Sequence, residues 1–255
     1  MVTEQEVDAI GQTLVDPKQP LQARFRALFT LRGLGGPGAI AWISQAFGDD
    51  SALLKHELAY CLGQMQDARA IPVLVDVLQD TRQEPMVRHE AGEALGAIGD
   101  PEVLELLKQY SSDPVIEVTG PPLVSLPVLG PWEALPSPAP ALRVPLSPAG
   151  LHCGSALFRH EVGYVLGQLQ HEAAVPQLAA ALARCAENPM VRHECAEALG
   201  AIARPACLAA LQAHADDPER VVRESCEVAL DMYEHETGRA FQYADGLEQL
   251  HGATS

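Results

Sequence analysis

The stretch KHELAYCLGQMQDARAIPVL, residues 55–74, decides the fold because it returns as RHEVGYVLGQLQHEAAVPQL, residues 159–178. The two copies are 104 residues apart, and 23 of the 45 positions that follow from His56 are identical between them. Each copy holds a shorter repeat, in which a basic residue, His-Glu, four residues and Leu-Gly recur after 33 residues. The motif histidines are His56, His89, His160 and His193. Repeats of this length are typical of stacked helical solenoids.

The segments between the motifs predict paired helices. IPVLVDVLQD (residues 71–80) carries apolar residues at helical intervals and a proline near its start, where no hydrogen-bond partner is lost. Asp-Pro steps at Asp100, Asp113 and Asp217 are helix start signals, with an N-cap carboxylate before proline. We therefore expect an all-α helical-repeat solenoid in two pseudo-symmetric halves.

The repeat pattern predicts three parts: helical repeats in residues 1–118 and 151–255, and an irregular segment in residues 119–150. Nine of the 32 residues in that segment are proline, which prevents a solenoid helix. It replaces the last helix of the first half and the counterpart of the helical lead-in (residues 3–47). An alternative exon or a translated non-coding stretch explains this better than an ordinary linker. We expect exposed apolar ridges at Val118 and Leu151, where repeats are missing.

Composition excludes several partners. The formal net charge is −17, from 34 acidic and 17 basic side chains, so the chain repels nucleic acid and anionic lipid. Such a surface attracts cationic ligands, although acidity also serves solubility alone. The six cysteines form no Cys-x-x-Cys motif, and most sit at apolar helical positions, as reduced cysteines do. No apolar run is long enough for a signal peptide or a membrane span, so we expect a cytoplasmic protein.

Four His-Glu pairs in one register indicate metal ligands, since imidazole and carboxylate together bind transition metals. The alternative is packing or simple inheritance within a duplicated repeat. However, the corresponding slots in the flanking repeats hold Phe25-Arg26 and Glu224-Ser225, so packing does not require His-Glu. A zincin needs a second histidine four residues after the first. Those positions hold Tyr60, Glu93, Tyr164 and Glu197, which excludes that class and leaves a dinuclear iron or manganese site as the better fit.

The segments KHELAYCLGQM, VRHEAGEALGAIGD, RHEVGYVLGQL and VRHECAEALGAIA resemble the four signature segments of the deoxyhypusine hydroxylase family. The resemblance covers residues 1–118 and 151–255. It implies HEAT-like repeats in two symmetric halves, two Fe²⁺ ions per chain in a di-iron centre, and O2 as co-substrate. The implied substrate is the deoxyhypusine side chain of translation initiation factor five-A.

The resemblance also implies residue roles. One iron would be bound by His56, His89 and Glu90, and the other by His160, His193 and Glu194. Catalytic Glu57 and Glu161 would hold the cationic substrate, and Met86 and Met190 would line its channel. Because residues 119–150 depart from the family, we expect weak or no activity. We also expect a monomer. Two alternatives stay open: a HEAT-repeat scaffold that grips a basic partner without catalysis, and a structural metal site that only joins repeats.

Overall fold

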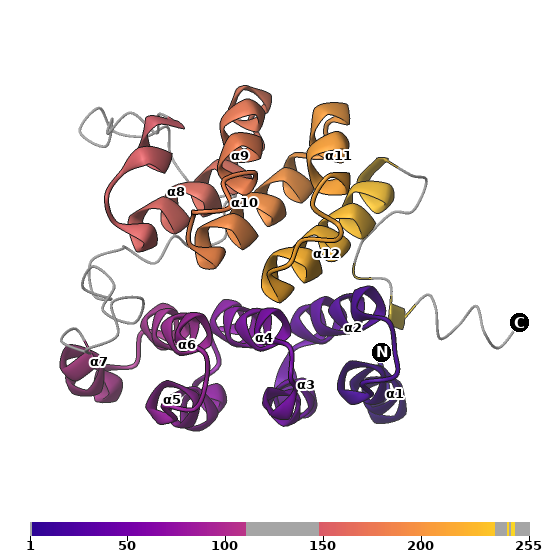
Figure 1. The fold of residues 1–255 in the computed structure, drawn as a ribbon. Coiled ribbons are helices and arrows are strands. Elements are labelled where there is room, and N and C mark those ends of the chain that lie inside the picture. The colour runs from indigo at the N-terminus through magenta and orange to yellow at the C-terminus, as the bar shows by residue number, and fades with distance from the viewer. Residues whose placement is uncertain (1, 111–147, 238–243, 245, 248–255) are drawn as a thin grey trace, which may run out of the picture. The chain divides into compact units, whose positions relative to one another are not determined.

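The computed structural model describes residues 2–110, 148–237, 244 and 246–247, and over these residues the regular elements are helices (Figure 1). By their contacts the residues form two units, 1–123 with 235–255, and 124–234. The prediction of an all-α solenoid is confirmed. Most of the Pro-rich segment and the Asp113 start signal lie outside the described residues, and the predicted three-part division stays a prediction.

The first unit is a run of helix pairs. Its elements are α1 (Glu4–Val15), α2 (Leu21–Leu34), α3 (Gly36–Gln45), η1 (Ala46–Gly48), α4 (Ala52–Met65), η2 (Ala68–Ala70), α5 (Ile71–Gln79), α6 (Pro85–Ile98), η3 (Pro101–Val103) and α7 (Leu104–Tyr110). Helix α4 packs between α2 and α6, while α1 and α3 lie side by side behind them. We call the row of α2, α4 and α6 the motif layer of this unit, because it carries both His-Glu motifs (Figure 1).

The second unit repeats this arrangement. Its elements are η6 (Pro148–His152), α8 (Ala156–Leu169), η7 (Glu172–Ala174), α9 (Val175–Leu182), α10 (Pro189–Ile202), α11 (Pro205–Gln212) and α12 (Arg220–Thr237). Helix α10 packs on α8, and α9 and α11 pack behind it. Both motif helices of this unit begin and end 104 residues after their counterparts α4 and α6, so the duplication read from the sequence is a duplication of structure.

Local signals set the helix starts as the sequence predicts. Thr3 and Glu6 form the expected capping box at α1, with each side chain accepting a backbone N–H of the other residue. Ser51 caps α4, and Ser155 caps α8 in the same way. The Asp100 carboxylate accepts the N–H of Glu102 at the start of η3. These caps satisfy helix donors that would otherwise lose their partners.

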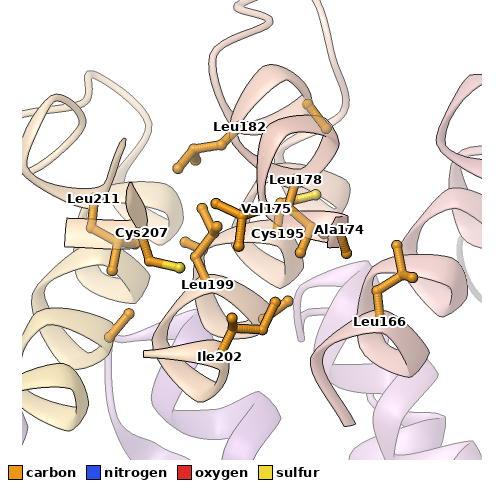
Figure 2. Close-up of a cluster of buried hydrophobic side chains, with 14 of the residues drawn as sticks. Leu166, Ala174, Val175, Leu178, Leu182, Cys195, Leu199, Ile202, Cys207 and Leu211 are labelled. Carbon is orange, nitrogen blue, oxygen red and sulfur yellow. The ribbon is translucent and has the colours of Figure 1, made fainter. Parts of the chain in front are cut away.

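The core of the second unit is built from small and branched side chains of α8, α9, α10, α11 and α12 (Figure 2). Leu178 and Leu199 are fully buried there, together with the thiols of Cys195 and Cys207. Burial raises the pKa of a third thiol, that of Cys226, to about 12. Four of the six cysteines are buried, as predicted, and the two exposed ones are Cys153 and Cys185.

The basic residue before each motif histidine anchors the motif helix to its neighbours. Arg192 on α10 donates from Nε to the carbonyl of Leu182 at 2.8 Å and bonds both carboxylate oxygens of Asp217. Arg88 on α6 makes the same carbonyl contact to Leu78 at 2.9 Å. Because these guanidinium groups are buried and fully engaged in the packing, the motif arginines serve the fold.

Replacing Asp217 by Asn should lower the free energy of unfolding by about 3–5 kcal/mol, because Arg192 would remain buried without its counter-charge. Burial opposes the charged form of Asp217, but the Arg192 guanidinium outweighs it and holds the pKa below its usual range. The carboxylate therefore stabilises the fold fully above its unfolded pKa, and this contribution is lost below about pH 4. Urea titrations at several pH values would measure both effects. Exposed Asp216, changed to Asn, is the control.

Helix α8 is less well covered than its counterpart α4. Leu54 on α4 is 0% exposed, whereas Phe158, 104 residues later on α8, is 46% exposed. Leu169 at the end of α8 is also exposed. The predicted apolar ridge is therefore real, but its placement at Leu151 is wrong. That residue is buried because η6 folds back onto α8 and α9 and carries it into the core. Val118 lies outside the described residues.

The two equivalent positions should respond unequally to truncation. Leu54→Ala removes a fully buried side chain and should lower the free energy of unfolding by about 2–5 kcal/mol. Phe158→Ala should cost about 1 kcal/mol or less, because half of that side chain already faces water. Chemical denaturation of both variants checks this, and equal losses would show that something covers Phe158.

Candidate metal-binding clusters

The four motif histidines lie buried on neighbouring helices, two in each unit. His56 is on α4 and His89 on α6, while His160 is on α8 and His193 on α10. Each is at most 3% exposed. Buried imidazoles beside carboxylates are costly unless their charges and hydrogen bonds are matched, so four such groups in one register indicate a site.

In the first unit, a histidine lies between two carboxylates. His56 Nε2 is 3.2 Å from Glu90 Oε2 of the next helix, and His56 Nδ1 is 3.4 Å from Glu57 Oε1. His89 Nε2 lies 3.3 Å from Glu93 Oε1, one turn further along α6. We call these five residues the N-terminal cluster.

The second unit builds the same arrangement. His160 Nε2 is 3.3 Å from Glu194 Oε2, and His160 Nδ1 shares a 3.1 Å hydrogen bond with Glu161. His193 Nδ1 lies 3.4 Å from Glu197 Oε1, and the rings of His160 and His193 are 5.5 Å apart between centroids. These five residues form the C-terminal cluster. Within it, ligand atoms of His193, Glu194 and Glu197 all lie within 4.8 Å of one another, a spacing that could hold a metal ion.

The electrostatics of the N-terminal cluster favour a cation. Burial disfavours a charged imidazole, but Glu90 and then Glu57 outweigh it and raise the pKa of His56 well above its ordinary value. Carboxylates that stabilise a proton on a buried imidazole also stabilise a metal cation in its place. Imidazole and carboxylate donors at these distances therefore suit a divalent transition metal.

The Leu-Gly of the first motif in each half explains how its histidine reaches the carboxylate of the next helix. A Cβ added at Gly63 on α4 would lie 2.8 Å from the Cα of Ala94 on α6, and one at Gly167 would lie 2.9 Å from the Cα of Ala198. Such contacts are too short for any side chain. Glycine therefore lets the motif helices approach closely, and this approach brings His56 within reach of Glu90.

Gly167→Ala should lower the free energy of unfolding by about 1–3 kcal/mol, because α8 and α10 must separate to admit the methyl group. Gly33→Ala is the matched control. It adds the same methyl group inside helix α2, where a Cβ would meet nothing within 4 Å, and should not destabilise the chain. Thermal unfolding of both variants is the measurement, and equal behaviour would contradict the close-packing role of the motif glycine.

The remaining predicted site residues are less fully defined by the structure. Met86 and Met190 are buried in the first turns of α6 and α10, three residues before their histidines and so on the same helix face. Their predicted role in lining a substrate channel stays a prediction, as do the roles of Glu57 and Glu161. Glu93 and Glu197 were identified in the sequence only as residues that exclude a zincin. The signal for them was present, since the motifs alternate between His-Glu-x-x-Tyr and His-Glu-x-x-Glu.

Comparison with known proteins agrees with this geometry. HEAT repeats match residues 7–85, 41–119 and 146–231. Deoxyhypusine hydroxylase of Homo sapiens is 76% identical over 303 aligned positions, and that of Bos taurus is 67% identical over 304, with 100% of both chains covered in each case. The chain belongs to the deoxyhypusine hydroxylase family. The family resemblance drawn from the four motifs and the HEAT-like fold are therefore confirmed.

A solved structure of human deoxyhypusine hydroxylase in complex with glycerol matches with a TM-score of 0.82 and 73% identity, covering 91% of this chain and 97% of the other. The 303 aligned positions of the human comparison exceed the 255 residues of this chain, so at least 48 of them are gaps on this side. This member of the family is therefore shorter than its human relative. Among the described residues, no helix has the length and apolar character of a membrane span.

Proposed function

We propose that the chain is a di-iron, O2-dependent monooxygenase that hydroxylates the deoxyhypusine side chain of translation initiation factor five-A. The observation that carries this proposal is the pair of buried His-Glu clusters, repeated 104 residues apart in a chain whose curated relatives are named deoxyhypusine hydroxylase. We also propose that it acts as a cytoplasmic monomer.

Each half would bind one iron through two histidines and one glutamate. The first set is His56, His89 and Glu90, and the second is His160, His193 and Glu194. Two imidazoles and one carboxylate are the ligand set of non-haem iron oxygenases, and they leave positions open for oxygen. When bound, iron supplies the activation of O2 needed to place a hydroxyl group on carbon. Burial of all six side chains supports this assignment, because it excludes bulk water from such a reaction.

Glu57 and Glu161 would hold the substrate. Deoxyhypusine carries a cationic, polyamine-like chain, and these carboxylates lie directly beside the first histidine of each cluster. A carboxylate there attracts an ammonium group and so orients the neighbouring carbon toward the metal. Met86 and Met190 would contact the methylene groups between the charges, a contact that suits a flexible thioether.

The shortened chain is expected to be weakly active or inactive. At least 48 positions of the human relative have no counterpart here, and α8 exposes a face whose equivalent on α4 is covered. A dinuclear reaction requires both ligand sets to be held within roughly half an ångström of their working positions. All the motif residues remain, but the family resemblance implies that helical repeats are missing where residues 119–150 stand.

Two other functions make different predictions. A HEAT-repeat scaffold would use the carboxylates to bind a basic partner and would require no iron. A structural metal site would bind iron yet form no product. The exposed acidic charge of the chain is compatible with the scaffold, but a scaffold gives no reason to bury four histidines beside carboxylates.

The decisive experiment measures iron per chain, the visible absorption spectrum and O2-dependent hydroxylation of purified deoxyhypusine-bearing initiation factor. We expect iron binding, with a rate far below that of an uninterrupted relative assayed in parallel. His89→Ala should remove the iron of its half and abolish hydroxylation. His171→Ala is the control, since that exposed histidine lies outside both clusters and should leave both readings unchanged.

Iron content and product formation separate the scaffold from the metal-binding readings. A chain that binds no iron while retaining a basic partner is a scaffold, and a chain that binds iron but never forms product under O2 holds a structural metal or an inactive centre. Rates equal to those of the uninterrupted relative would contradict the proposed loss of activity.

A further inference from the structure

The second histidine of each cluster carries a carboxylate contact that no assigned role explains. His89 lies 3.3 Å from Glu93, and His193 lies 3.4 Å from Glu197. Both glutamates stand four residues after their histidine, so one helical turn places them on the same face. The contact occurs in both halves of a chain that has diverged at about half of the compared positions, which points to a shared requirement.

We infer that Glu93 and Glu197 are positioning residues that fix the ring orientation and tautomer of His89 and His193 for metal binding. The inference rests on the proposed iron site. A carboxylate beside one ring nitrogen favours the proton on that nitrogen and leaves the lone pair on the other. Metal-binding histidines commonly have such an outer partner, which raises the basicity of the donor nitrogen.

Their exposure separates these glutamates from the proposed ligands. The side chains of Glu93 and Glu197 are 32% and 23% exposed, whereas those of Glu90 and Glu194 are 8% and 6% exposed. A rim carboxylate keeps its charge in contact with water while it holds a fully buried ring. The buried carboxylates instead lie against the first histidine, on the neighbouring helix.

The first histidine of each cluster has its orienting carboxylate at a different position in the sequence. His56 and His160 have their carboxylate partner in the adjacent residue, Glu57 or Glu161, and hold Tyr60 or Tyr164 four residues later. Tyrosine therefore stands four residues after a histidine whose carboxylate partner is the adjacent glutamate, and glutamate stands there when that position supplies the partner. Each motif histidine thus has one neighbouring carboxylate that is not a proposed metal ligand. In the second motif of each half, this carboxylate comes from the next turn of the same helix.

The ring nitrogen of the second histidine that faces the glutamate differs between the two halves. Glu93 faces Nε2 of His89, while Glu197 faces Nδ1 of His193. On this inference the proton lies on Nε2 of His89 and on Nδ1 of His193, which leaves Nδ1 of His89 and Nε2 of His193 for the metal. This gives a spectroscopic readout that needs no metal, because the two neutral tautomers have different ¹⁵N shifts.

The test compares Glu197→Ala and Glu197→Gln in the full chain, with exposed Glu172→Gln as the control. In metal-free protein, ¹⁵N correlation spectra should show the Nδ1-protonated tautomer of His193 in the parent chain and its loss in the Ala variant. Iron affinity, measured by chelator competition, should fall about 10- to 100-fold in the Ala variant. The Gln variant keeps an oxygen acceptor for the ring N–H. It should therefore retain most of the Nδ1-protonated tautomer of His193 and most of the iron affinity.

Three results would overturn the inference. An unchanged tautomer in Glu197→Ala removes the positioning role whether or not the chain binds iron. Equal iron affinity in the parent chain and the Ala variant would show that the positioning of His193 by Glu197 does not affect metal binding. Loss of iron in Glu197→Gln as severe as in the Ala variant, with the tautomer kept, identifies Glu197 as a direct ligand. Failure of the parent chain to bind iron contradicts the proposed function instead, and the tautomer still decides the role of Glu197.

Discussion

The close approach of the motif helices is the constraint on which both clusters depend. A methyl group at Gly63 or Gly167 would overlap the backbone of the next helix, so these helices touch with no side chain between them. Only at such separation does a histidine on one helix lie about 3 Å from a glutamate on the next. In the first motif of each half, the glycine therefore sets the helix separation at which the histidine contacts the glutamate of the next helix.

The buried basic residue before the motif histidine fixes the motif helix against the helix that precedes it. Arg88 and Arg192 hold their helices to the preceding helix through a carbonyl ten residues earlier. Arg24 makes the same contact to Leu14 in the lead-in repeat, which has no metal motif. The arginine is thus part of the general repeat, whereas His-Glu is an addition to it. The flanking repeats fit this distinction, because they have a basic residue at Arg24 and Arg223 but hold other residues in the His and Glu slots.

Sequence alone predicted the helical repeats and the duplication, because both follow from periodic patterns that survive divergence. The membership of the family came from the resemblance of the four motif segments to its signature segments. The sequence also predicted which side chains would be buried together in each half, from the spacing of His56 and His89. The sequence analysis placed the exposed apolar ridge at Leu151, because no sequence pattern shows that η6 turns back and buries that residue. It also passed over Glu93 and Glu197, because a contact between a ring and a rim carboxylate depends on side-chain direction.

The two clusters are copies in sequence but not in environment. The Glu57 side chain is 9% exposed and that of Glu161 is 23% exposed, although both precede identical Leu-Gly steps. The packing of their helices differs as well: α4 packs against α2, whereas α8 packs against η6 and leaves Phe158 partly exposed. A carboxylate nearer to water has a weaker field at its histidine, because solvent screens it. The C-terminal cluster therefore keeps the residues of the N-terminal one but holds one of its carboxylates nearer to solvent.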